Sequence, residues 1–260
     1  MAAPVVFKPP GLSIDEEARV RSIKSGKGRA APEDQMKRKT PDVVIVGAGG
    51  HGKVVLDILR ADGRYRPVGY VDADPSLTDS YVGGLPVLGA VNALPRLRQQ
   101  RIKRAIVAIG DNRTRLHYAG VLLEQGFELV NAVHPTAFVS PNAKLGLNVV
   151  VAPHASVVTE CTVADSAIIN TSAVVDHECE IGEGAHICPG AVLAGRVRVG
   201  RAAFIGIGAN VIQCRSIGRF AVVGAGAAVI EDVPDYATAV GVPARVLKVS
   251  PPDALEPANR

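Results

Sequence analysis

The chain has few of the features that mark membrane, secreted or metal-binding proteins. It contains no tryptophan, and only 4% of its 260 residues are aromatic. No apolar run approaches the roughly 20 residues needed to cross a bilayer, so we expect no membrane span. The N-terminus lacks the apolar core of a secretory signal. Four cysteines, none in a CxxC pair, suit a reducing compartment, so we expect a cytoplasmic protein.

Positive charge is concentrated at the N-terminus. Residues 1–40 hold nine Lys or Arg and five Asp or Glu, whereas the remaining residues carry twenty of each sign. The segment is rich in Pro, Gly and Lys, so we expect a basic, disordered tail with a helical turn near Ile14–Ile23. Because the tail lacks interleaved aromatics and the body is neutral, we expect no nucleic-acid partner.

The dominant signal is a six-residue repeat between Val133 and Val229. At seventeen consecutive repeats the reference position is Val, Ile or Leu. The residue four positions further on is Ala eleven times, Val three times, Cys twice and Arg once. An α-helix cannot keep this register, because its period is about 3.6 residues. A hexapeptide repeat instead predicts a parallel β-helix, and the length of the run argues against a Val-rich β-sandwich.

The two phases of the repeat predict where side chains point. If the aliphatic position is i, positions i−2 and i share the inner face of a short strand, because side chains alternate. Positions i−1 and i+1 then point outward, and i+2 and i+3 form a corner. Three such faces close a coil of about eighteen residues. Cys161 and Cys179 are therefore interpreted as stacked core residues, and Cys188 as an outward one with no assignable base.

Residues 41–131 alternate strand and helix patterns. We expect strands at Asp42–Val46, Val68–Val71 and Ala105–Ile109, and helices at Lys53–Arg60, Ala93–Gln100 and Thr114–Gln125. Such alternation predicts a parallel sheet. The predicted fold class is thus an α/β N-terminal domain with a small Rossmann-like sheet (41–131), a β-helix (132–248) and a C-terminal tail (249–260).

A glycine-rich loop follows the first expected strand. The sequence GAGGHG at 47–52 fits G-x-G-x-x-G, and Asp72 lies twenty residues beyond it. Such glycines let backbone N–H groups approach a phosphate at a helix N-terminus. The unit is half of a full dinucleotide-binding fold, so one nucleotide fits better than NAD. The Gly110–Asn112 stretch would lie at a neighbouring strand end, although ordinary turn chemistry explains Asp72 and Asp111 equally well.

Two histidines of the repeat region point away from the predicted core. His177 occupies a corner, and His186 occupies position i−1 on the next face. Gly195 lies one coil beyond His177 and leaves the surface open there. An exposed histidine can act as a general base at neutral pH, but either residue taken alone is by default a plain surface histidine. The predicted coil is a triangular prism with a convex surface, so a site on its outside would be bounded by the protein on one side only. A cleft would therefore need a second subunit to form the other wall.

Zinc is the rival use of these histidines. The γ-class carbonic anhydrases bind metal with histidines on this kind of fold, in a pattern with two histidines five residues apart. Here the spacings are 23 residues from His154 to His177 and nine from His177 to His186. We therefore expect no metal, while ligation across subunits stays open.

The combined motifs resemble a known family of left-handed β-helix acyltransferases. The chain looks like the sialic acid O-acetyltransferase and nucleotide-amino-sugar N-acetyltransferase family, whose members modify sugars for bacterial surface glycans. The resemblance covers residues 42–248 and rests on GVPAR at 241–245, the loop at 47–52, IGDN at 109–112 and VDHEC at 175–179. It implies left-handed coils, against the usual crossover rule. It also implies a homotrimer with acetyl-CoA in grooves between subunits.

The resemblance further implies roles for individual residues. His177 would be the general base, and Glu178 would raise its basicity. The family's acetyl-CoA positions match His186, Gly195, Ile207 and Ala225, and its nucleotide-sugar positions match Gly49, Gly50, His51, Asp72 and Gly110. Two positions depart from the pattern of some members. Ala225 replaces a glycine, and Ala73 replaces a second Asp.

The implied reaction is acetyl transfer from acetyl-CoA to the amino group of a nucleotide-linked amino sugar. The amine would lose a proton to His177 and attack the thioester directly. Because an amine is already a good nucleophile, no acyl-enzyme is needed. Two alternatives stay open: a sugar O-acetyltransferase of the sialic acid type, and a non-catalytic nucleotide-binding regulator that would take NAD. The sequence does not distinguish UDP from GDP.

Overall fold

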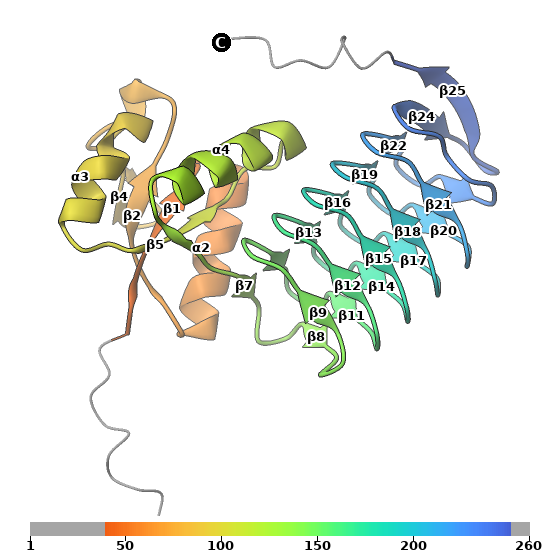
Figure 1. Ribbon diagram of the computed structural model, residues 1–260, viewed down its shortest axis with the longest axis horizontal. Coiled ribbons are helices and arrows are strands. Elements are labelled where there is room, and N and C mark those ends of the chain that lie inside the picture. The colour runs from red at the N-terminus through yellow and green to blue at the C-terminus, as the bar shows by residue number, and fades with distance from the viewer. Residues whose placement is uncertain (1–39, 251–260) are drawn as a thin grey trace, which may run out of the picture. The chain divides into compact units, whose positions relative to one another are not determined.

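The computed structural model describes residues 40–250 (Figure 1). The expected basic tail lies outside the described residues except for Thr40. The helical turn expected near Ile14–Ile23 also lies outside them, as does all but the first two residues of the expected C-terminal tail.

The first part of the described chain is a four-stranded parallel sheet with the strand order β2-β1-β5-β6. Its strands are β1 (Asp42–Val46), β2 (Arg66–Val71), β5 (Arg104–Val107) and β6 (Glu128–Leu129). The helices are α2 (Gly50–Asp62), α3 (Leu94–Gln99) and α4 (Asn112–Glu124). The parallel pairing confirms the predicted Rossmann-like sheet.

Helix α2 starts three residues before the predicted Lys53. Glycines have low helix propensity, so sequence reasoning left them in the loop. In the structure, the helix nevertheless begins at Gly50, and Gly49 is its N-cap residue with an extended backbone. A short hairpin, β3 (Tyr81–Val82) with β4 (Leu85–Pro86), was not predicted, and the 3-10 turns η2 (Pro75–Leu77) and η3 (Val91–Ala93) complete the domain.

The second part is a β-helix whose strands stack into three sheets (Figure 1), and most of these strands are two residues long. We call the three sheets the covered, open and charged sheets. The covered sheet comprises β7 (Ala132–Val133), β10 (Val150–Val151), β13 (Ile168–Ile169), β16 (His186–Ile187), β19 (Phe204–Ile205), β22 (Val222–Val223), β24 (Ala237–Val240) and an antiparallel β25 (Arg245–Val249). The open sheet comprises β8 (Phe138–Val139), β11 (Ser156–Val157), β14 (Val174–Val175), β17 (Val192–Leu193), β20 (Asn210–Val211) and β23 (Ala228–Val229). The charged sheet comprises β9 (Lys144–Leu145), β12 (Thr162–Val163), β15 (Glu180–Ile181), β18 (Arg198–Val199) and β21 (Ser216–Ile217).

The register of the repeat is confirmed. Val151 pairs with Val133 on one side and with Ile169 on the other, one coil away in each direction. Both inward phases form one buried cluster, which includes Cys161 and Cys179 as predicted. Arg215, the single charged residue at the small inward position, remains partly exposed and reaches Asp232 at 3.7 Å.

The corners have a repeated backbone conformation. Position i+3 adopts a left-handed conformation in many coils, with φ of 60° at His154, 60° at Glu160 and 59° at Glu178. A non-glycine residue in this region costs about 1–2 kcal/mol. The core must outweigh this cost at each corner, so the fold depends on the regular inward stacking.

The α/β domain packs on the covered sheet. The outward residues Ala132, Val150 and Ile168 are fully buried and share a hydrophobic cluster with Val55 and Ile58 of α2. Asn148, at a corner of the β-helix, accepts a hydrogen bond from the backbone N–H of Val107 at the end of β5, at 2.8 Å. Side chains that the repeat directs outward are therefore not all exposed.

Candidate functional site

His177 lies at the corner between β14 and β15, where its side chain is 46% exposed. Its Nδ1 is 2.9 Å from Oε2 of Glu178, and Arg196 donates from Nε to the same oxygen at 3.0 Å. Donation from His177, followed by donation from Arg196, lowers the pKa of Glu178, so this carboxyl stays ionised. Because a carboxylate only accepts, the contact places a proton on Nδ1 and leaves Nε2 with a free lone pair.

Gly195 lies beside this imidazole. A Cβ built at Gly195 would collide with Cε1 and Nε2 of His177. A side chain at this position would displace the ring from Glu178 and cover Nε2. The glycine therefore keeps the lone pair of His177 accessible, which supplies a physical reason for the open surface predicted there.

The open sheet separates two groups of the candidate acetyl-CoA residues. His177 and Gly195 lie at the corner that follows it, whereas Ile207 and Ala225 lie at the corner that precedes it. The face between the two edges carries exposed apolar side chains, namely Phe138, Val192, Ile212 and Ile230. One chain therefore does not bring these candidates together.

The fourth acetyl-CoA candidate, His186, belongs to the covered sheet. It points out of the coil as predicted, but it is only 7% exposed, so the expectation of a surface position was wrong. The repeat gives the direction of a side chain and contains no information about what covers it. His186 Nε2 lies 3.0 Å from Nδ2 of Asn170, and its ring contacts Phe204 edge-on with centroids 5.3 Å apart.

His186 lies instead near His51 of the glycine-rich loop, with ring centroids 6.4 Å apart. Burial, and then the charge of Arg115, lowers the pKa of His51 to about 4 and that of His186 to about 3. Both rings are therefore neutral at pH 7. Within the described residues, His51 Nε2 is buried without a hydrogen-bond partner, and the backbone of Gly110 lies against His186. The structure thus joins a predicted nucleotide-sugar residue to a predicted acetyl-CoA residue.

Cys188 falls at an outward position of the repeat, as predicted, but it is covered. It is 3% exposed, and burial raises the pKa of its thiol to about 12. Only the thiolate is an effective nucleophile. Cys188 is thus unsuited to form an acyl-enzyme, which agrees with direct transfer.

The glycine-rich loop presents an uncapped helix N-terminus. No side chain caps α2, and Cβ atoms added at Gly49 or Gly50 would meet nothing within 4 Å. A Cβ at Gly52, in contrast, would collide with the carbonyl of Gly47. The last glycine of the motif is therefore needed for close packing, while the middle ones leave room for a ligand's phosphate.

The two aspartates at the strand ends have structural partners. Asp72 accepts hydrogen bonds from the N–H groups of Ala48 at 2.7 Å and Asp74 at 2.9 Å. Asp111 caps α4 by accepting from Thr114 N at 2.8 Å. The turn chemistry considered as an alternative is present for both. A contact from Asp72 to a ligand stays a prediction.

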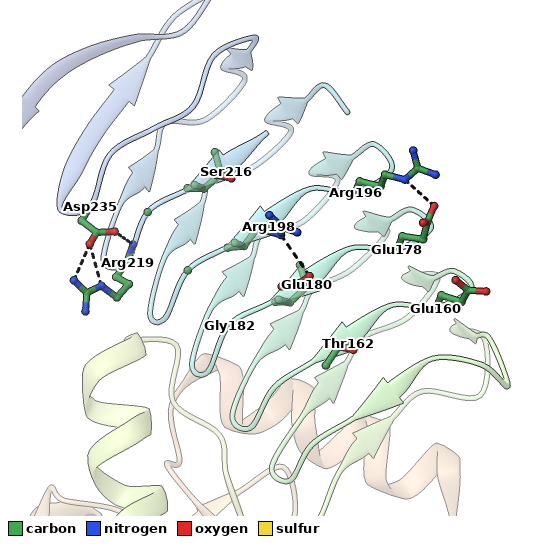
Figure 2. Close-up of a pocket in the computed structure, with 15 residues that line it drawn as sticks. Glu160, Thr162, Glu178, Glu180, Gly182, Arg196, Arg198, Ser216, Arg219 and Asp235 are labelled. Atoms are coloured by element: carbon green, nitrogen blue, oxygen red, sulfur yellow. Dashed lines mark hydrogen bonds and ion pairs between the residues drawn. The ribbon is translucent and has the colours of Figure 1, made fainter. Parts of the chain in front are cut away.

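Two concave regions border candidate site residues. An open groove of about 840 Å³ runs along the charged sheet (Figure 2). Its lining includes Glu178 and Arg196, the partners of His177, and its other charges are largely paired, with Glu180 and Arg198 3.4 Å apart and Arg219 and Asp235 2.8 Å apart. A smaller pocket of about 260 Å³ contains Gly110, Arg113 and Phe204 and so adjoins His186.

Several neighbours of the site were missed by sequence reasoning. Asn170 and Phe204 contact His186. The charge of Arg115 lowers the pKa of both His51 and His186. The only available signal was that Asn170 and Phe204 fall at outward positions. Within residues 40–250, no three His, Cys, Asp or Glu side chains converge as metal ligands. No helix in the same range is long and apolar enough to cross a membrane.

Comparisons with known proteins match both parts of the chain. Residues 42–122 match the family model described as the PglD N-terminal domain. A variant of perosamine N-acetyltransferase from Caulobacter crescentus, with CoA and GDP-perosamine, is 46% identical with a TM-score of 0.78, covering 81% of this chain and 98% of that one. The acetyltransferase domain of PglB from Neisseria gonorrhoeae FA1090, in complex with acetyl coenzyme A, is 37% identical with a TM-score of 0.75, covering 80% and 100%. WeeI from Acinetobacter baumannii AYE is 25% identical with a TM-score of 0.71, covering 80% and 100%.

Proposed function

The chain belongs to the hexapeptide-repeat acyltransferase family that includes perosamine N-acetyltransferase and the PglB acetyltransferase domain, and from this premise we propose its reaction. It transfers an acetyl group from acetyl-CoA to the amino group of a nucleotide-linked amino sugar. The observation that carries the proposal is the 46% identity, over both domains, to an enzyme crystallised with CoA and GDP-perosamine. The same relationship supports the left-handed winding of the β-helix and favours an amine over the hydroxyl of an O-acetyltransferase.

His177 is proposed as the general base. The neutral sugar amine bonds to the thioester carbonyl carbon, and Nε2 takes the proton that this nitrogen loses. The C–S bond then breaks, and the proton on His177 is available to the departing CoA thiolate. Glu178, held by Arg196, keeps Nδ1 protonated and stabilises the imidazolium. A base placed in this way contributes about 10²–10⁴ in rate.

The acetyl-CoA cleft is proposed to lie between subunits of a homotrimer. His177 and Gly195 follow the open sheet, and Ile207 and Ala225 precede it, so the two pairs face different sides of one prism. If three copies pack through their open sheets, one edge of each copy meets the opposite edge of its neighbour. The exposed apolar side chains on this sheet support such packing, because large exposed apolar patches mark interaction sites.

The nucleotide is proposed to bind at the α/β domain. The open N-terminus of α2 at Gly49 and Gly50 can receive a phosphate, and His51, His186 and Gly110 line the region next to it. Because the similar perosamine enzyme was crystallised with GDP-perosamine, a GDP-linked amino sugar is the first substrate to test. Acetyl-CoA and nucleotide sugars are cytosolic metabolites, which favours a cytoplasmic location.

The test is release of free CoA thiol from acetyl-CoA in the presence of candidate acceptors. We expect release with a GDP- or UDP-linked amino sugar and none with its N-acetylated form, which lacks a nucleophilic amine. Sialic acid as the preferred acceptor would replace this proposal with O-acetylation. Tight NAD binding by calorimetry, with no competition from either nucleotide sugar, would overturn the assignment of the α/β domain.

A further inference from the structure

Arg115 of α4 is among the largest fully buried side chains in the described part of the protein. Among residues 40–250, the acceptors that contact it directly are all neutral: four backbone carbonyls and one side-chain amide oxygen. Burial lowers the pKa of its guanidinium to about 10, so the group stays charged at neutral pH. A buried cation is costly unless its hydrogen bonds are satisfied, and an apolar side chain could hold a helix here at lower cost. The presence of a buried arginine at this position therefore indicates a role other than packing.

All five N–H donors of this guanidinium are used. Nε donates to Ser166 O at 2.7 Å, and one Nη2 hydrogen donates to Gly184 O at 2.8 Å. Arg115 therefore bridges the same corner of the β-helix in two successive coils. Nη1 donates to Ile109 O at 2.8 Å and Gly110 O at 3.0 Å. The other Nη2 hydrogen donates to the Asn112 side chain at 2.8 Å.

Asn112 extends the same connection by one coil. Its Nδ2 donates to the carbonyls of Ala202 and Ala203, each at 3.1 Å. The strand-end segment Ile109–Gly110 is thus tied to three successive coils through two side chains. Apolar packing tolerates sliding, whereas a planar fork with fixed donor directions does not.

This strand end adjoins the nucleotide-sugar region. Gly110 lies against His186, which in turn lies near His51, and Gly110 also lines the pocket of about 260 Å³. A shift of the segment would move Gly110 relative to both histidines. It would leave His177 and Gly195, at the opposite side of the β-helix, in place.

We propose that Arg115 is a positioning residue for nucleotide-sugar binding. Its guanidinium fixes the Ile109–Gly110 strand end against the β-helix corners at Ser166 and Gly184, and so sets the wall that the nucleotide sugar contacts. The inference rests on the proposed function for its substrate and on the hydrogen bonds alone for its geometry. Arg115 touches neither acetyl-CoA nor the reacting atoms in this account.

The kinetic test uses Arg115→Lys, which keeps the charge and loses the fork. We expect kcat/KM for the nucleotide sugar to fall by roughly 10- to 100-fold, chiefly through KM, because small misplacements cost this much. The KM for acetyl-CoA should not change. Asn112→Ala, which removes the next contact along, should show the same split with a smaller effect, and it replaces Arg115→Lys if that variant fails to fold.

Asn148→Ala is the matched control. Asn148 is equally buried and also joins the α/β domain to the β-helix, through Val107 N at 2.8 Å and Ser166 Oγ at 3.0 Å, but it does not contact Gly110. We expect it to lower the melting temperature and leave both KM values unchanged. An unchanged nucleotide-sugar KM in Arg115→Lys, or the same KM rise in Asn148→Ala, would overturn the proposal.

Hydrogen exchange separates this inference from the reaction itself. In Arg115→Lys, amides of residues 108–112 should exchange faster than in the wild type, while those of β1 keep their protection. Equal exchange at 108–112 would overturn the positioning role whether or not the enzyme is active. A different outcome is also possible: the wild type releases no thiol with any nucleotide sugar, and residues 108–112 still exchange faster in Arg115→Lys than in the wild type. That result would remove the proposed function and keep the anchoring role of Arg115.

Discussion

The covered and open sheets share one repeat but have different surroundings. Outward residues of the covered sheet, such as Val150, Ile168 and His186, are buried by the α/β domain. Outward residues of the open sheet, such as Phe138 and Val192, stay exposed in the single chain. Both sheets carry apolar side chains on the outside. On the covered sheet these side chains contact the α/β domain, and on the open sheet we expect them to contact another copy of the chain.

The histidines show the chemical consequence of this difference. On the covered sheet, His186 loses solvent and is neutral at pH 7 because burial lowers its pKa. At the edge of the open sheet, His177 keeps solvent access and a carboxylate partner. Both residues point out of the coil in the sequence pattern, and the difference in solvent access is the reason that His177 is the one proposed as the base.

The largest effect is expected at the edge of the open sheet. His177→Ala should lower turnover by about 10²–10⁴ with little change in acetyl-CoA affinity, because it removes the proton acceptor and no binding contact. His154→Ala, at another exposed corner of the same β-helix, should retain wild-type turnover. Single-turnover kinetics with both variants checks the contrast, and near-normal turnover in His177→Ala would remove this base.

A charge on the open sheet should separate the subunits. Val192→Lys would bring like charges together wherever three open sheets pack, so we expect monomers and a roughly tenfold or greater loss of turnover. Ser216→Lys places the same residue at an outward position of the charged sheet and should leave the assembly intact. Light scattering with parallel assays reads both, and a trimeric, active Val192→Lys protein would refute the assigned interface.

The covered sheet should show a smaller, pH-dependent effect. The folded-state pKa values of about 4 for His51 and about 3 for His186 lie below the unfolded value. Between pH 6.5 and 4 the unfolded chain therefore binds protons that the folded chain does not, and the free energy of unfolding falls as pH falls.

His186→Gln removes one of these groups. Its loss of stability between pH 7 and pH 5 should be smaller than that of the wild type by about 1–2 kcal/mol. His154→Gln, at an exposed corner, should follow the wild type. Urea unfolding at both pH values measures the difference, and parallel pH dependence in all three proteins would contradict neutral burial of His186.

The parts of the fold set by local repetition were predictable from the sequence. The seventeen aliphatic positions define the register, which places Cys161 and Cys179 inside and His177 at a corner. The β1 strand was also predicted with its observed bounds, because a short apolar run before a glycine loop has few alternatives.

The parts that depend on distant segments were not predictable. Cys188 and His186 are covered by residues far away in sequence, and no period records that contact. Arg115 looked like one more charge on a helix, although its five donors reach three separate segments. The β3–β4 hairpin was missed because its two-residue strands carry almost no pattern, and only the turn at Gly83 and Gly84, with φ of 54° and 79°, signals it.

Mixing two inactive variants tests the shared cleft most directly. His177→Ala damages the edge that follows the open sheet, and Ile207→Asp damages the edge that precedes it. Co-expressed and purified as mixed trimers, they should recover about a third of wild-type turnover, because one of the three clefts in each mixed trimer joins two intact edges from neighbouring copies. If each cleft belonged to a single chain, no mixed trimer would hold an intact one. Turnover no higher than that of the separate variants would therefore contradict the account.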